Sequence, residues 1–170
     1  MIGMDLDQFN NMTVDQLKAE LTRCCGSSRW VEQMIAARPF KSVDELLTCS
    51  DDVWQYLAAD DWQEAFAHHP KIGDLDSIRA KFASTSDWAQ GEQKGVASAS
   101  EDVLQALAKG NSDYEQKFGY IFIVCATGKS ADQMLTLLQE RLKHEPAHEI
   151  REAMHEQNKI TWIRLEKLLS

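Results

Sequence analysis

His69 and Pro70 form the pair of residues in this sequence that most directly suggests chemistry. A proline crowds the residue before it and disfavours the helical conformation there, so the helix expected over residues 60–66 should end before His69. The imidazole would then project from a fixed helix end. Because imidazole titrates near neutral pH, a rigidly held one is a candidate proton donor or acceptor. Most His-Pro pairs only end helices, so the pair alone does not establish catalysis.

Glu92 is the strongest carboxylate candidate, and it lies between Gly91 and Gly95 with Gln93 beside it. Each of these glycines costs a helix about 1 kcal/mol relative to alanine, which suggests close packing or room for a ligand. Adjacent helical residues point about 100° apart, so Glu92 and Gln93 line one site only where a helix end faces it. A solvated pair on a surface helix is the simpler interpretation of these residues alone.

Two other groups of polar residues have weaker chemical interpretations. His68 and His69 are adjacent and do not face one ion from a helix, and no second cluster at ligand spacing accompanies them, so we predict no metal. Arg164 lies on the more apolar side of the expected last helix. There its charge either extends past apolar neighbours to water or pairs with a carboxylate, for which a guanidinium is well suited.

Composition indicates one globular domain over residues 1–170, because 44% of the residues are hydrophobic and the chain is long enough to bury a core. The net charge of −9 argues against a nucleic-acid partner. Cys24, Cys25, Cys49 and Cys125 form no C-x-x-C pair, and reduced thiols in a cytoplasmic protein are the simplest explanation. We also predict no secretory leader and no membrane span, since no apolar run has the required length.

Helix-start signals recur along the chain, where a hydroxyl residue is followed three positions later by Glu or Gln in the capping-box pattern. Apolar residues at helical spacing follow each of these starts, which predicts an all-α fold. The pairs are Thr13 and Gln16, Ser42 and Glu45, Ser98 and Glu101, and Ser130 and Gln133.

Gly110 and Asn111 look like a break between two helical pieces, the second of which ends at Gly119. Residues 120–126 have strand-like composition, but a lone strand cannot form a sheet, so we predict a buried extended or helical segment there. A long last helix is predicted from about residue 147 to 169. The architecture is therefore a single compact bundle of about eight or nine helices. The inward-facing candidates of the last helix are Ile150, Met154, Ile160, Ile163 and Leu168.

Several segments, in this order along nearly the whole chain, resemble 2-oxo-4-hydroxy-4-carboxy-5-ureidoimidazoline (OHCU) decarboxylase, the enzyme family that closes the urate-to-allantoin route of purine degradation. The aromatic segment around Phe118-Gly119-Tyr120 is the most specific, and the two-residue pieces are less so. The chain is similar to the stand-alone form of the family. The matching residues are His69-Pro70-x-Ile72-Gly73, Glu92-Gln93, Tyr114-x-x-Lys117-Phe118-Gly119-Tyr120-x-Phe122-Ile123-Val124, Arg141-Leu142 and Lys159-Ile160-x-x-x-Arg164-Leu165.

This resemblance implies an all-α homodimer that needs no metal or organic cofactor. It implies that His69 is the catalytic acid/base, with Glu92 beside it, and that Pro70 lines the site. Glu92 and Gln93 would hold the ureido and ring groups of the substrate, and Arg164 would be a cation near the site. The family often has a small hydroxyl residue where this chain has Ala89, so a substrate hydrogen bond there is missing or is supplied by other groups.

The resemblance also implies that one continuous segment presents backbone groups to the planar substrate ring. The expected reaction is the stereospecific decarboxylation of OHCU to (S)-allantoin and CO₂. Another enzyme of ureide metabolism, a non-enzymatic helical interaction module and a His-rich metal-binding domain are the alternatives. The residues of the backbone segment are Phe122, Ile123, Val124, Cys125 and Ala126.

Overall fold

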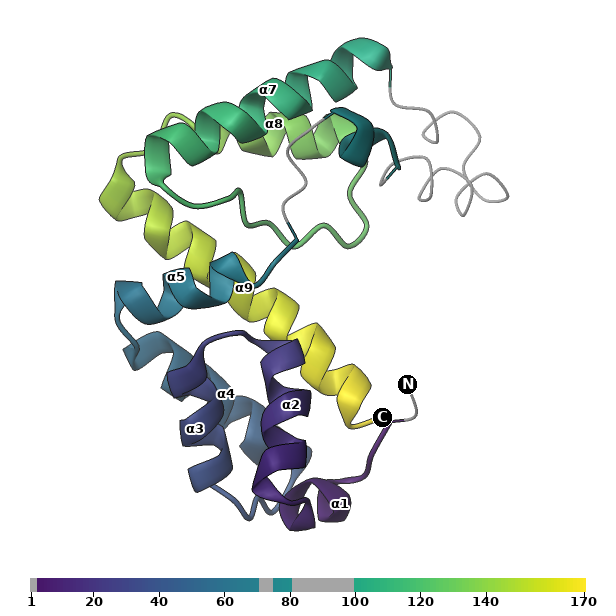
Figure 1. Cartoon of the computed structure of the whole chain (residues 1–170), viewed down its shortest axis with the longest axis vertical. Helices are drawn as coiled ribbons and strands as arrows, with labels where there is room; N and C mark the ends of the chain where they lie inside the picture. The colour runs from purple at the N-terminus through teal and green to yellow at the C-terminus, as the bar shows by residue number, and fades with distance from the viewer. Residues whose placement is uncertain (1–2, 71–74, 81–99) are drawn as a thin grey trace. The chain divides into compact units, whose positions relative to one another are not determined.

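The structure, a computed structural model, describes residues 3–70, 75–80 and 100–170. In these ranges the backbone forms helices joined by turns and extended segments, with no β-strand, which confirms the predicted all-α class (Figure 1). Residues 75–80 are helical. The other helices are α1 (Leu6–Asn11), α2 (Val14–Cys24), α3 (Ser28–Ala36), α4 (Val43–Tyr56), α5 (Ala59–Ala67), α7 (Glu101–Phe118), α8 (Ala131–Arg141) and α9 (Pro146–Leu168).

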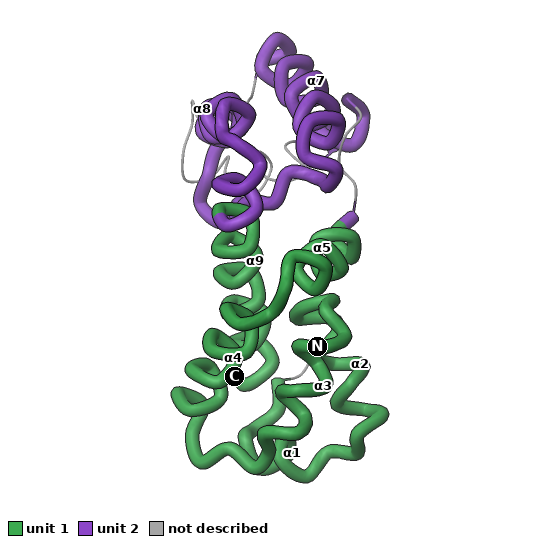
Figure 2. The backbone as a smooth tube through the Cα atoms, turned by 90° about the vertical axis from the view of Figure 1, so that its left-hand side faces the viewer, with its two compact units in different colours: residues 1–69, 152–170 green, residues 70–151 purple. Residues whose placement is uncertain are grey.

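The chain forms two compact units (Figure 2). The first contains residues 1–69 and 152–170, and the second contains residues 70–151. Helix α9 contributes its first residues to the second unit and the rest to the first. The expectation that residues 1–170 form a single domain stays a prediction.

Side-chain caps explain where most helices begin. The hydroxyl groups of Thr13, Ser42 and Ser130 accept the backbone N–H of the residue three positions later, as the sequence pattern predicted. The prediction for α7 was wrong by two positions, because Ser100 caps this helix and accepts the N–H of Val103. The paired pattern at Ser98 lies outside the described residues.

The first unit packs helices α1 to α5 and most of α9 around a large aromatic and aliphatic core. Polar atoms of its tryptophans are satisfied inside this core, since the indole N–H of Trp30 donates to Ser50 Oγ at 3.1 Å. Trp54 donates to the carbonyl of Met154 at 2.8 Å and so joins α4 to α9. The core residues include Phe9, Leu17, Leu21, Trp30, Met34, Leu46, Phe66 and Leu165.

The second unit packs α7 against α8, and Gly110 lies at their contact. Helix α7 runs through Gly110 without a break, so the predicted interruption at Gly110 and Asn111 was wrong. A Cβ atom at Gly110 would lie 2.6 Å from Leu138 Cδ2, because α8 approaches this turn closely. The glycine therefore serves packing between helices rather than helix termination. Gly119 does end α7, in a left-handed conformation with φ of 85°.

Helix α9 faces the protein with more polar residues than its sequence suggested. Of the predicted inward residues, Met154 and Leu168 are buried, and the three isoleucines are only half-buried. The buried positions include Glu149, Gln157 and Thr161, each of which has hydrogen-bonding partners. Burial of these polar groups is tolerated because they are paired.

The four cysteines are free thiols, which confirms that no disulfide forms among them. Burial raises the pKa of the Cys24 and Cys25 thiols to about 12, so neither is a reactive thiolate in the folded chain. Cys125 is also buried, whereas Cys49 is partly accessible. Within the described residues, no helix combines the length and the apolar character that crossing a membrane requires.

Candidate active site

The end of α5 holds His69 in place as the sequence predicted. The helix stops at Ala67, His68 is its C-terminal cap, and the His69 N–H donates to the carbonyl of Phe66 at 3.2 Å. Pro70 follows without an N–H to continue the helix. His69 is half-buried, while His68 and Pro70 are exposed.

A chain of neutral hydrogen bonds supports the His69 ring from α9. The Nε2 atom lies 2.5 Å from Gln157 Oε1, and Gln157 Nε2 donates to Thr161 Oγ1 at 3.1 Å. Gln157 and Thr161 are 1% and 2% exposed, so water does not compete for these bonds. An amide oxygen can only accept, so in this orientation of the Gln157 side chain the ring nitrogen facing it is the donor.

A pocket of about 320 Å³ opens beside this imidazole within the first unit. His69 and Arg164 both line it, so the structure brings together two of the predicted site residues. The pocket has a cationic character, because Arg23 and Arg164 line it and none of its lining residues in the described part of the chain is a carboxylate. The lining residues are Thr22, Arg23, Gly26, Ala65, His68, His69 and Arg164.

The surroundings of His69 favour its neutral form. Burial is the largest cause that lowers its pKa, and the positive charges of Arg164 and His68 lower it further. The hydrogen bond to Gln157 acts in the opposite direction but does not reverse the shift. The ring is therefore uncharged at neutral pH and can accept a proton.

Of the two roles that the sequence left open for Arg164, contact of the charge with water is the one that the structure shows. The residue is exposed, and its Nη1 donates to the backbone carbonyl of Arg23 at 3.2 Å. This bond anchors the guanidinium at the pocket wall while its charge stays in contact with solvent. It pairs with no carboxylate among the described residues, so an anionic ligand would find it available.

Gly26 and His68 are pocket residues whose roles the sequence did not reveal. A Cβ atom at Gly26 would lie 2.2 Å from Cγ and 2.5 Å from Cβ of His68, so only glycine allows the His68 side chain its observed position. Gln157 and Thr161 were also missed. Their spacing of four residues puts both on one helix face, but nothing local indicates that His69 is their partner.

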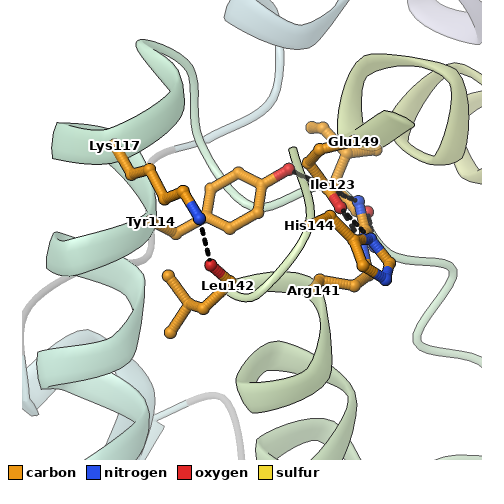
Figure 3. A network of polar contacts seen from close by, with 7 residues as sticks. All are labelled: Tyr114, Lys117, Ile123, Arg141, Leu142, His144 and Glu149. Carbon is orange, nitrogen blue, oxygen red and sulfur yellow. Dashed lines mark hydrogen bonds and ion pairs between the residues drawn. The ribbon is translucent and has the colours of Figure 1, made fainter. Parts of the chain in front are cut away.

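The predicted backbone segment belongs to the second unit, where it is non-helical and tied to a buried polar network (Figure 3). Arg141 Nη1 donates to the carbonyl of Ile123 at 2.6 Å, and its guanidinium carbon lies 4.7 Å from the centre of the Phe122 ring. Lys129 Nζ donates to the carbonyl of Cys125 at 2.7 Å. The segment is thus fixed through the carbonyl groups of Ile123 and Cys125.

Glu149 is the centre of this network, and it is fully buried. Its Oε2 accepts from Arg141 Nε at 2.8 Å, from Arg141 Nη2 at 2.5 Å and from the Tyr114 hydroxyl. Its Oε1 lies 3.0 Å from His144 Nδ1. Burial and the bond to Glu149 raise the pKa of Tyr114, which keeps this hydroxyl a proton donor.

Three predicted site residues, Glu92, Gln93 and Ala89, lie outside the described residues. Their predicted roles stay predictions. In the part of the chain that the structure describes, no group of three or more His, Cys, Asp or Glu side chains could hold a metal ion. His144 and His148 are stacked on each other, with ring centres 4.1 Å apart.

Comparison with known proteins identifies the fold and then the family. The structure superimposes with a TM-score of 0.72 on a crystal structure of OHCU decarboxylase in the presence of (S)-allantoin, at 36% identity, covering 88% of this chain and 96% of that one. An (S)-allantoin synthase structure matches with a TM-score of 0.71 over 98% of this chain and 54% of that one, and its 16% identity supports the fold alone. The class of fold is therefore that of OHCU decarboxylase.

The OHCU decarboxylase family model matches residues 10–166, and the chain belongs to this family. A uric acid degradation bifunctional protein of Arabidopsis thaliana is 41% identical over 149 residues, which cover 86% of this chain and 45% of that protein. The bifunctional protein of a Bacillus species is 26% identical, and the match covers 97% of this chain and 32% of that protein. The chain thus spans less than half the length of these two relatives. An OHCU decarboxylase of Haloferax volcanii is 25% identical over 100% of this chain and 99% of that protein.

Proposed function

We propose that this protein converts OHCU to (S)-allantoin and CO₂ without a cofactor. The family match over residues 10–166 carries this proposal. The pocket that contains His69 and Arg164 supports it, because it combines a neutral imidazole with an exposed cation. A non-enzymatic interaction module, by contrast, would need neither the pocket nor the supported ring.

The substrate itself explains why a cofactor is unnecessary. Its C=N bond and carbonyl groups are conjugated with the carbon that loses CO₂, so they take up the electron pair that the departing carboxylate leaves. The protein must hold the carboxylate out of that plane, stabilise the developing charge with fixed donors and deliver one proton to one face. Proton delivery to a single face makes the product one enantiomer.

We assign these tasks to the residues that line the pocket and to those predicted to face it. Arg164 offers a guanidinium that can bind a carboxylate or a ureido oxygen through parallel N–H bonds. His69 exchanges the proton. By the family resemblance, Glu92 and Gln93 hold the ureido and ring groups, and Pro70 and residues 122–126 also take part in substrate binding.

The activity test uses freshly generated OHCU and follows the optical activity of the allantoin that forms. We expect the wild-type protein to accelerate the reaction and to produce the S enantiomer. Racemic allantoin at the uncatalysed rate would contradict the proposed function. Full activity after exhaustive treatment with a chelator would support the proposal that no metal takes part.

The role of His69 is tested with His69→Ala, for which we expect a loss of about 10²- to 10⁴-fold in kcat, the usual contribution of acid–base catalysis. His155→Ala is the matched control, because His155 is an exposed histidine of α9 in the same unit. Circular dichroism of both variants checks that the fold survives. A folded His69→Ala protein with wild-type turnover would remove the assigned role.

The proposal includes a homodimer in the cytoplasm. The family resemblance supports the dimer, and light scattering of the purified protein at several concentrations tests it. The free thiols support a reducing compartment, where cysteines stay unpaired. Fractionation of the native cells tests this location.

A further inference from the structure

We propose that Gln157 and Thr161 are positioning residues that hold neutral His69 as its Nε2–H tautomer, so that Nδ1 is the atom that exchanges the proton with the substrate. This inference rests on the proposed function, and it assigns roles to two residues of α9 that touch the imidazole or its support. The proton that Nδ1 accepts is the one it returns, so the ring is neutral again at the end of each cycle.

The direction of the hydrogen bonds decides the tautomer. The amide of Gln157 can be placed in two orientations, one offering its oxygen to His69 and the other its NH₂ group. In the observed orientation Nε2 of Gln157 points to Thr161 Oγ1 at 3.1 Å and the oxygen points to His69 at 2.5 Å. Thr161 is therefore the residue that selects the orientation.

Thr161 selects the orientation by offering a lone pair of its hydroxyl oxygen to the amide, as the observed contact requires. Gln157 then donates to Thr161, and its oxygen is the atom left for His69.

The chain of bonds thus runs from His69 to Gln157 and then to Thr161, all within the first unit. Its members beyond His69 are buried, so water cannot replace a lost bond. The groups that face the imidazole besides Gln157 are Arg164 and His68, and the charges of both lower its pKa. A neutral amide under a ring with a lowered pKa keeps that ring uncharged and ready to accept a proton at Nδ1.

The direct test is the ¹⁵N NMR spectrum of the His69 ring, assigned by the signals that vanish in His69→Asn. The two nitrogen shifts of a neutral imidazole distinguish the tautomers. At a pH where the ring is neutral, we expect a protonated Nε2 and an unprotonated Nδ1 in wild type. A protonated Nδ1 in wild type would overturn the inference whatever the variants show.

Thr161→Val removes the selecting hydroxyl without changing the shape of the side chain. The amide of Gln157 is then free to turn, and we expect the spectrum to shift toward a mixture of tautomers, with kcat falling about 10- to 100-fold as it does for outer partners of metal-bound histidines. Thr136→Val is the matched control, because Thr136 is an exposed helical threonine of the second unit whose hydroxyl bonds only to the backbone of Asp132. An unchanged ring spectrum in Thr161→Val would contradict the selection.

Substitutions of Gln157 separate positioning from packing. Gln157→Leu removes the acceptor, whereas Gln157→Glu keeps one and adds a charge that raises the His69 pKa. At a pH above that raised pKa, we expect Gln157→Glu to retain the Nε2–H form and to recover at least about tenfold of the kcat that Gln157→Leu loses. Equal activity of the two variants would overturn the positioning role. If Gln157→Leu fails to fold, the wild-type and Thr161→Val spectra still decide which tautomer His69 adopts and whether Thr161 selects it. A wild-type protein inactive on OHCU contradicts the proposed function alone, because the spectra need no substrate.

Discussion

The two units contain polar networks of opposite character. In the first unit, His69 is supported by neutral groups, an amide and a hydroxyl, and the network ends at a pocket. In the second unit, Arg141 and Glu149 form a buried ion pair to which Tyr114 also bonds.

The charge of each network decides what the network can do. A carboxylate beneath an imidazole would stabilise its charged form, whereas an amide holds the ring without charging it, so the first network leaves His69 able to titrate. A buried ion pair strongly resists rearrangement because each charge would be costly without the other. The second network therefore suits the fixing of a backbone segment, and the first suits a proton carrier.

Breaking the charged network should cost more stability than any other change considered. Arg141→Met leaves Glu149 buried without its cation, and we expect a loss of about 3–5 kcal/mol in the free energy of unfolding. Urea denaturation measures this loss. The double variant Arg141→Met with Glu149→Leu removes both charges, and we expect it to recover a large part of the stability. A single variant as stable as wild type would mean that the pair contributes nothing.

The next largest loss of stability is expected where a glycine packs closely against a side chain, at one position in each unit. Gly26→Ala places its Cβ against atoms of His68 near the backbone, whereas Gly110→Ala meets the end of the Leu138 side chain, which can move. We expect both to lose stability by about 1–3 kcal/mol, with the larger loss at Gly26. Thermal unfolding of the two variants compares them. Adding His68→Gly to Gly26→Ala should restore stability, and no restoration would show that the strain lies elsewhere.

Removal of the Arg164 charge tests whether this charge lowers the pKa of His69. Arg164→Gln deletes a positive charge that lowers the His69 pKa, so we expect that pKa to rise. An NMR titration of the ring measures it without reference to activity. Lys167→Gln removes the same charge from the next turn of α9 and serves as the control. Equal shifts in both variants would point to net charge rather than to the proximity of Arg164.

The smallest expected effect is the pH dependence of stability. Because the pKa of His69 is lowered in the folded state from 6.5, the unfolded chain takes up this proton first as the pH falls. The free energy of unfolding should therefore decrease from about pH 6.5 downward and level off below the folded pKa. His69→Asn lacks this contribution, so its urea midpoint should change less between about pH 7.5 and about pH 5.5 than that of wild type. If the urea midpoints of wild type and His69→Asn changed equally between the two pH values, the lowered pKa of His69 would be contradicted.

Local signals predicted the elements better than the contacts between them. The caps at Thr13 and Ser130 and the helix end before His69 depend on neighbours within a few residues, and the structure confirms them. The meaning of Gly110 depends on Leu138, which is distant in the sequence, so a packing glycine was taken for a helix break.

The candidate site also depends on contacts between distant residues, which local sequence signals do not reveal. His69 and Arg164 attract attention by their chemistry, and both line one pocket. Gln157 and Thr161 look like ordinary polar residues of a long helix, because their importance comes from a partner 88 positions away in the sequence. A buried polar stripe cannot be distinguished from a solvated one until the facing helices are known.

The placement of the cysteines makes them reporters of local opening. Cys24 and Cys25 are buried in the first unit and Cys125 in the second, so each can react with a thiol reagent only when its own unit opens. Partly accessible Cys49 would be labelled first and can be blocked beforehand. The order in which the remaining sulfur atoms are modified would then give separate opening rates for the unit that contains His69 and for the unit that contains the ion pair.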